Sequence, residues 1–158
     1  MNTFILKWQG PYNDDTIRQV RKIKGLYLIT GYQKFKRIKA MQFSGICESR
    51  HFLTERLRNE SKHFVLRDAQ YWVAMLVSEK EITRTELELV ESMINNFWRP
   101  ELSSIKQFHM GEPTLLINRW YNTQGMLRRK ITNKEQKVSD IIYWDGTTWL
   151  LADRLRQI

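Results

Sequence analysis

Two charged side chains fall on the apolar sides of predicted helices, where they could serve phosphate chemistry. Glu91 lies at the edge of an apolar stripe, where a carboxylate loses hydration unless a cation pairs with it. Arg56 lies four residues after Phe52 and therefore shares its side of the helix. The carboxylate could bind a metal ion, and the guanidinium could bind a phosphate group.

Each of these residues also has a purely structural interpretation, which the residues alone leave open. Glu91 could reach water from the helix boundary or pair with an arginine. Arg56 could cover the core with its aliphatic stem while its head stays hydrated. Tyr27, in the apolar run GLYLITG, could be an ordinary core residue of a strand.

The charge of the chain favours a polyanionic partner. The 26 basic and 17 acidic residues give a net charge of +9. The excess is concentrated in residues 1–58, which hold 12 basic and 4 acidic side chains. This distribution is typical of nucleic-acid-binding proteins, although a solvated basic surface is the alternative.

The hydrophobic pattern predicts strands and helices in alternation up to residue 103, followed by strands. A capping-box pattern at Thr83 and Glu86 starts the clearest helix, and Pro100 ends it. Asp145 and Gly146 indicate a hairpin turn. Strands are expected at 2–8, 25–31, 42–46, 68–78, 114–121 and in 140–155, and helices at 50–61 and 83–98.

Cysteine content indicates a reducing compartment, and hydropathy indicates a protein that does not cross a membrane. Cys47 is the only cysteine, which excludes an intramolecular disulfide and a multi-cysteine zinc site. No apolar run is long enough to cross a membrane, and the first residues lack the pattern of a signal peptide. We therefore expect a soluble, cytoplasmic protein with no membrane partner.

The order of these elements resembles the GIY-YIG nuclease superfamily over about residues 5–103. The resemblance rests on the segments KWQGPYN, GLY, QFSGI, RHFLTERLRN and ELVESMINNFWRPELS, in that order. It implies an α+β fold, with a small antiparallel or mixed three-stranded sheet flanked by helices. The nuclease-like domain would span 1–103, and a β-rich extension of 104–158 would pack on it.

The resemblance also implies a metal-dependent DNA endonuclease that hydrolyses phosphodiester bonds. Glu91 matches the metal-binding glutamate, so it would hold Mg²⁺ or Mn²⁺. Tyr27 of the first motif and Arg56 match catalytic positions. The partner would be DNA, with RNA as an alternative. The basic residues between the two motif strands would lie near the nucleic-acid backbone: Lys34, Lys36, Arg37 and Lys39.

Three positions depart from the family pattern. Phe43 replaces the second tyrosine, Ser103 replaces an asparagine, and Glu60 stands where relatives often carry histidine or tyrosine. Two alternatives therefore remain open. One is a relative that binds nucleic acid without cutting it. The other is a protein-interaction module that acts through its tryptophan-rich C-terminal strands.

Overall fold

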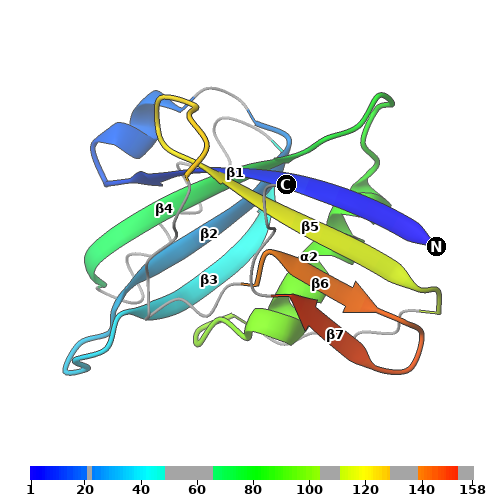
Figure 1. The fold of residues 1–158 in the computed structure, drawn as a ribbon. Coiled ribbons are helices and arrows are strands. Elements are labelled where there is room, and N and C mark those ends of the chain that lie inside the picture. The colour runs from blue at the N-terminus through cyan, green and yellow to red at the C-terminus, as the bar shows by residue number, and fades with distance from the viewer. Residues whose placement is uncertain (21–22, 49–65, 104–110, 129–138, 153–158) are drawn as a thin grey trace.

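Among the residues that the structure describes, a curled mixed sheet of seven strands and a single α-helix form the fold (Figure 1). The computed structural model describes residues 1–20, 23–48, 66–103, 111–128 and 139–152, with side chains up to residue 150. The predicted helix at 50–61, with Arg56 and Glu60, lies outside the described residues. Among the described residues, no helix has the length and apolar character needed to cross a membrane.

The sheet has the strand order β3-β2-β4-β1-β5-β6-β7. Strands β1 and β5 are parallel, and every other neighbouring pair is antiparallel. The strands are β1 (Asn2–Tyr12), β2 (Gly25–Tyr32), β3 (Ala40–Cys47), β4 (Arg67–Leu76), β5 (Thr114–Tyr121), β6 (Ile141–Trp144) and β7 (Trp149–Ala152). The helices are the short 3-10 helix η1 (Thr16–Gln19) and the α-helix α2 (Arg84–Trp98).

The predicted three-stranded sheet flanked by helices is wrong. The structure has one seven-stranded sheet, because β5 pairs with β1 along eight residues and β6 and β7 continue from it. The β-rich C-terminal strands therefore extend the same sheet as the first part of the chain (Figure 1). The expected pairing of the two motif strands is confirmed, since β2 and β3 are antiparallel neighbours.

The two faces of the sheet carry separate hydrophobic clusters, because successive strand residues point to opposite faces. On the α2 face, Leu26 and Leu28 pack with residues of the helix. On the opposite face, Tyr27 and Ile29 pack with Ile17 of η1. Neighbouring residues of β2 therefore belong to different hydrophobic clusters, one on each face of the sheet.

Helix α2 forms as its sequence predicts. The Thr83 side chain accepts a hydrogen bond from the Glu86 backbone, and the Glu86 side chain accepts one from the Thr83 backbone, so the capping box is complete. The C-terminal cap is Arg99 in the left-handed region, directly before Pro100. Its buried side chains are Leu87, Val90, Met93, Ile94, Asn95 and Trp98.

Tryptophans form much of the core between the sheet and α2. Trp8 stacks on Trp120 with ring centroids 5.3 Å apart, and its indole N–H donates to Asn118 Oδ1 at 2.9 Å. Trp120 is only 3% exposed, so it is a core residue and offers no binding platform. Trp144 and Trp149 are partly buried and pack against each other across the β6–β7 hairpin.

The β6–β7 hairpin turns where Asp145 and Gly146 predict it. Asp145 accepts hydrogen bonds from the backbone and hydroxyl groups of Thr147 and Thr148. These bonds, those from Thr148 first, hold the pKa of Asp145 well below its usual value. The turn is thus held by its own side chains.

Candidate functional site

The β2–β3 hairpin places Tyr27 directly against Gly45. The two residues are cross-strand partners. A Cβ atom built on Gly45 would lie 2.5 Å from the Tyr27 hydroxyl oxygen and 2.6 Å from Cζ. The ring therefore occupies the space that a side chain at position 45 would need. Tyr27 is 2% exposed, which makes it part of the core in this conformation.

The segment after α2 returns along the outer edge of β3. The backbone N–H groups of Glu101 and Leu102 donate to the carbonyls of Met41 and Gln42, each at 2.9 Å. The Ser44 N–H then donates to the Ser103 hydroxyl at 3.0 Å. Ser103, at the position of the expected asparagine, is thereby fixed beside the second motif.

Glu91 lies on α2, partly buried, at the boundary that its position in the sequence predicts. The helix covers the face of the sheet that Leu26 and Leu28 line, whereas Tyr27 packs on the opposite face. The structure thus places Tyr27 and helix α2, which carries Glu91, on opposite faces of the sheet, an arrangement that does not favour one shared site. The hypothesis that Tyr27, Arg56 and Glu91 meet stays a prediction, because Arg56 lies outside the described residues.

A divalent ion at Glu91 would need ligands from water and substrate. Within the described ranges, no group of three His, Cys, Asp or Glu side chains could hold a metal ion. One carboxylate is compatible with Mg²⁺, which keeps several waters and often binds through one or two carboxylates together with substrate phosphates. The donor chemistry of Glu91 thus fits Mg²⁺.

Phe43, at the position where the nuclease resemblance predicts a tyrosine, packs in the core. It belongs to the cluster that contains Tyr27 and Tyr71. Because it has no hydroxyl group, it offers no proton or hydrogen bond there. The structure thus gives Phe43 a packing role.

A polar pair that the sequence analysis missed lies on the same face as Tyr27. The Tyr71 hydroxyl donates to Asp14 Oδ1 at 2.5 Å, although the residues are 57 positions apart. Burial, followed by the hydrogen bond to Asp14, raises the pKa of Tyr71 well above its usual value. Burial also raises the pKa of Tyr12, the cross-strand partner of Tyr71. No spacing signal in the sequence could have paired Asp14 with Tyr71.

An irregularity in β1 brings Tyr12 opposite Tyr71. The register between β1 and β4 shifts between Gln9 and Tyr12, and the Gly10–Pro11 peptide bond is cis. A Cβ atom on Gly10 would lie 2.8 Å from both Trp72 Cε3 and the Tyr71 carbonyl oxygen. The GPY segment thus forms the end of β1, where the register shift places Tyr12 opposite Tyr71.

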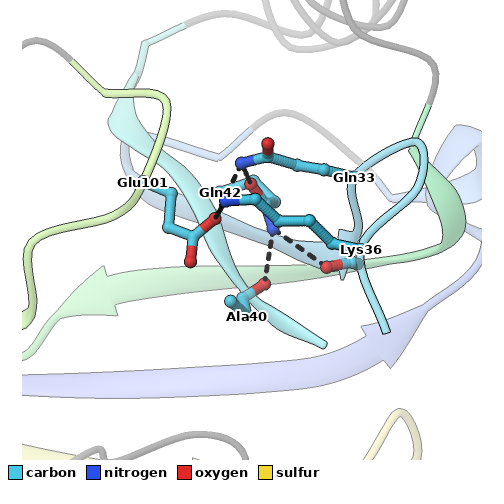
Figure 2. A network of polar contacts seen from close by, with 6 residues as sticks. Gln33, Lys36, Ala40, Gln42 and Glu101 are labelled. Atoms are coloured by element: carbon cyan, nitrogen blue, oxygen red, sulfur yellow. Dashed lines mark hydrogen bonds and ion pairs between the residues drawn. The ribbon is translucent and has the colours of Figure 1, made fainter. Parts of the chain in front are cut away.

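A buried glutamine anchors the loop between β2 and β3, residues 33–39, which we call the β2–β3 loop (Figure 2). Gln42 is fully buried and donates to the Gly31 carbonyl at 3.0 Å. Its own carbonyl accepts from Gln33 Nε2 at 2.9 Å. Gln33 Nε2 also donates to Glu101 Oε2 at 2.7 Å, so the loop is tied to the segment after α2.

The four basic residues of the β2–β3 loop differ in their surroundings. Lys36 Nζ lies 3.1 Å from Glu101 Oε2, and Lys39 Nζ donates to Gln70 Oε1 at 2.7 Å. Lys34 and Arg37 are exposed and have no acidic partner among the described residues. Lys34 and Arg37 are therefore the cations best placed to meet an external anion.

Comparisons with known proteins leave the family of this chain open. No protein-family model matches it, and no curated protein or solved structure is significantly similar to it.

Proposed function

We propose that the protein is a metal-dependent endonuclease that hydrolyses phosphodiester bonds in DNA. The observation that supports this proposal most is the geometry at the β2–β3 hairpin. Tyr27 lies against Gly45, and Ser103 is fixed to the adjacent Ser44. Three segments that the nuclease resemblance singles out therefore meet on one pair of strands, although 76 positions separate Tyr27 from Ser103.

Each proposed residue has a chemical role that its side chain can perform. The Tyr27 hydroxyl would orient the attacking water or accept its proton. Because a free tyrosine has a pKa of about 10, a nearby cation would have to stabilise its ionised form. Arg56 would neutralise charge that develops on the phosphoryl oxygens. Glu91 would hold Mg²⁺ or Mn²⁺, which when bound polarises the phosphate and stabilises the leaving oxygen.

The near-complete burial of Tyr27 sets a requirement for this chemistry. At 2% exposure, the tyrosine can act on water only if the surrounding side chains admit a phosphodiester. Catalytic contacts in free enzymes often tighten only when the substrate binds. We therefore expect Tyr27 to become more accessible in the DNA complex.

A second candidate function is nucleic-acid binding without cleavage. It is favoured by Phe43, which fills the core where the family has a second hydroxyl group, and by the buried position of Tyr27. The basic β2–β3 loop would serve either function, because its exposed cations can contact phosphates whether or not hydrolysis follows.

Cleavage of supercoiled, linear and single-stranded DNA with Mg²⁺ or Mn²⁺ distinguishes the two candidates. Glu91→Gln keeps the side-chain volume but removes the charge, so cleavage should fall about 100-fold or more. Glu88→Gln is the matched control, since Glu88 is exposed on the same helix and pairs with Arg84. DNA affinity in EDTA and the thermal midpoint should stay near the wild-type values in both variants.

Two outcomes would contradict the endonuclease proposal. Wild-type protein that binds DNA but cuts none of these forms would favour the binding function. Full cleavage by the Glu91→Gln variant would exclude Glu91 as the metal ligand and would return it to a structural role at the helix boundary.

A further inference from the structure

The β2–β3 loop exposes two apolar side chains at its tip. Phe35 is 90% exposed and Ile38 is 72% exposed. The loop projects beyond the body of the sheet as the connection between β2 and β3 (Figure 1). Single exposed apolar residues are common, but an aromatic ring with nearly all its surface in water forgoes a large gain from burial. A partner that covers this ring would recover that gain.

The backbone around Phe35 is held in a defined turn. Phe35 has a φ of 70°, a region that residues with a Cβ atom rarely adopt. The Lys36 N–H donates to the Gln33 carbonyl at 3.0 Å, and Arg67 Nη2 donates to the Lys36 carbonyl at 2.8 Å. With Gln42 anchoring the base of the loop, these bonds keep the ring presented to solvent. The entropy lost on binding would therefore be small.

Cations flank the ring on both sides in the sequence. Lys34 Nζ lies 5.2 Å from the centroid of the Phe35 ring, within cation–π distance. Arg37 follows two residues later and is exposed. Lys34 and Arg37 have no acidic partner in the part of the chain that the structure describes. An aromatic ring beside such cations is the combination with which proteins bind single-stranded nucleic acid, because the ring stacks on a base and the cations contact phosphates.

We propose that Phe35 stacks on an unpaired base of the bound nucleic acid while Lys34 and Arg37 contact the flanking phosphates. The substrate class would then be DNA with single-stranded or unpaired positions, because bases within a regular duplex are already stacked. This inference rests on the nucleic-acid binding in the proposed function. It restricts the substrate to DNA that contains unpaired bases. A membrane surface is a weaker fit, because membrane-binding elements present a broad apolar face, whereas this loop exposes two apolar side chains separated by basic residues.

Fluorescence anisotropy in EDTA tests the proposal without interference from cleavage. Three oligonucleotides of equal length are compared: a single strand, a perfect duplex, and a duplex with one unpaired 2-aminopurine. Phe35→Ala should weaken binding to the first and third by roughly 5- to 150-fold, the range for loss of one base–aromatic stack. Duplex affinity should change much less. Quenching of 2-aminopurine by the wild type should disappear in the variant.

Two further variants separate stacking from general effects. Phe35→Tyr retains an aromatic ring and should retain both affinity and quenching. Met126→Ala removes another exposed apolar side chain, which is 63% exposed in a different turn, and should change neither. Lys34→Ala and Arg37→Ala should weaken binding to all three oligonucleotides and reduce the salt dependence, because phosphate contacts are independent of base pairing.

Several results would overturn the inference. Equal losses on single strand and duplex, or no loss in the Phe35→Ala variant, would refute base stacking while leaving nucleic-acid binding intact. If wild-type protein binds none of the oligonucleotides, the proposed function fails as well. Binding to phosphatidylserine vesicles that exceeds binding to DNA and depends on Phe35 would identify the tip as a membrane contact instead.

Discussion

The contact between Tyr27 and Gly45 explains why position 45 of strand β3 is a glycine. Glycine weakens a strand unless another group takes the space beside it, and here the Tyr27 ring does so from the paired strand. The two residues therefore depend on each other. A tyrosine at position 27 requires glycine at position 45, whether its hydroxyl group is catalytic or structural.

Gly45→Ala should destabilise the protein by about 1–3 kcal/mol, because the added methyl group overlaps the Tyr27 ring. Gly111→Ala is the control, since no atom lies within 4 Å of a Cβ built there. Urea unfolding of both variants measures the difference. In the double variant with Tyr27→Ala the two losses should not add, because the clash is gone; strictly additive losses would argue against the contact.

Candidate site residues could be proposed from the sequence only where a local pattern singled them out, and their roles stay predictions. Glu91 could be found because an acid at the edge of an apolar stripe is unusual within one helix. The hydrogen bond between Tyr71 and Asp14 could not, because it depends on the pairing of β1 with β4 and on the bulge before Tyr12. Such contacts are set by register across the sheet.

The β2–β3 hairpin and its loop behave as one element because Gln42 ties them together. A fully buried amide that lost its partners would be costly, so its bonds to Gly31 and Gln33 specify how the loop leaves the strands. Glu101 adds the segment after α2 to the same network (Figure 2). The hairpin itself was predictable from two apolar runs, whereas its anchor was not.

Gln42→Leu should destabilise the protein by about 1–3 kcal/mol, because the buried Gly31 carbonyl loses its side-chain donor. Amide hydrogen exchange at Lys36 should accelerate as the loop loosens. Gln9→Leu, which removes one exposed hydrogen bond to the Thr123 carbonyl, should cost less than about 0.5 kcal/mol. Unchanged exchange at Lys36 in Gln42→Leu would show that the contacts with Arg67 and Glu101 hold the loop without Gln42.

Helix α2 was predictable in type and position, because its determinants are local. The capping box and the apolar stripe lie within the helix itself, and Pro100 follows it directly. The helix at 50–61 has a similar apolar pattern, but its prediction remains untested because it lies outside the described residues. Local sequence signals thus predicted the secondary-structure elements better than they predicted which strands lie side by side.

The architecture of the whole molecule depends on the pairing of β1 with β5, which no local sequence pattern predicts. Strand β1 lies inside the sheet because β5, more than a hundred positions later, pairs with it in parallel. If strands are paired only with their neighbours in sequence, β1 starts a small sheet and residues 104–158 form an extension of it. The prediction of a three-stranded sheet failed for this reason, because sequence patterns specify strands and not their long-range partners.

A fragment of residues 1–103 should fail to unfold cooperatively. Removal of β5 exposes the backbone edge of β1 and the indole ring of Trp8, and it removes Asn118, which accepts the indole hydrogen bond. Near-ultraviolet circular dichroism should lose the tryptophan signal, and urea unfolding should be broad. A sharp transition in this fragment, with an m-value in proportion to its length, would show instead that residues 1–103 fold as an independent domain.

The length of strand β2 has a further consequence if both proposals hold. Tyr27 and Tyr32 lie on the same strand, with Tyr32 at the end that leads to the β2–β3 loop. At a rise of about 3.3 Å per residue they are separated by about 17 Å, which equals about five nucleotides of one duplex strand at about 3.4 Å each. This is the span of the strand alone, to which the loop residues up to Phe35 add. The hairpin would then place the cut at a fixed number of nucleotides from the unpaired base. Inserting or deleting a pair of residues in β2 and β3 would change that number.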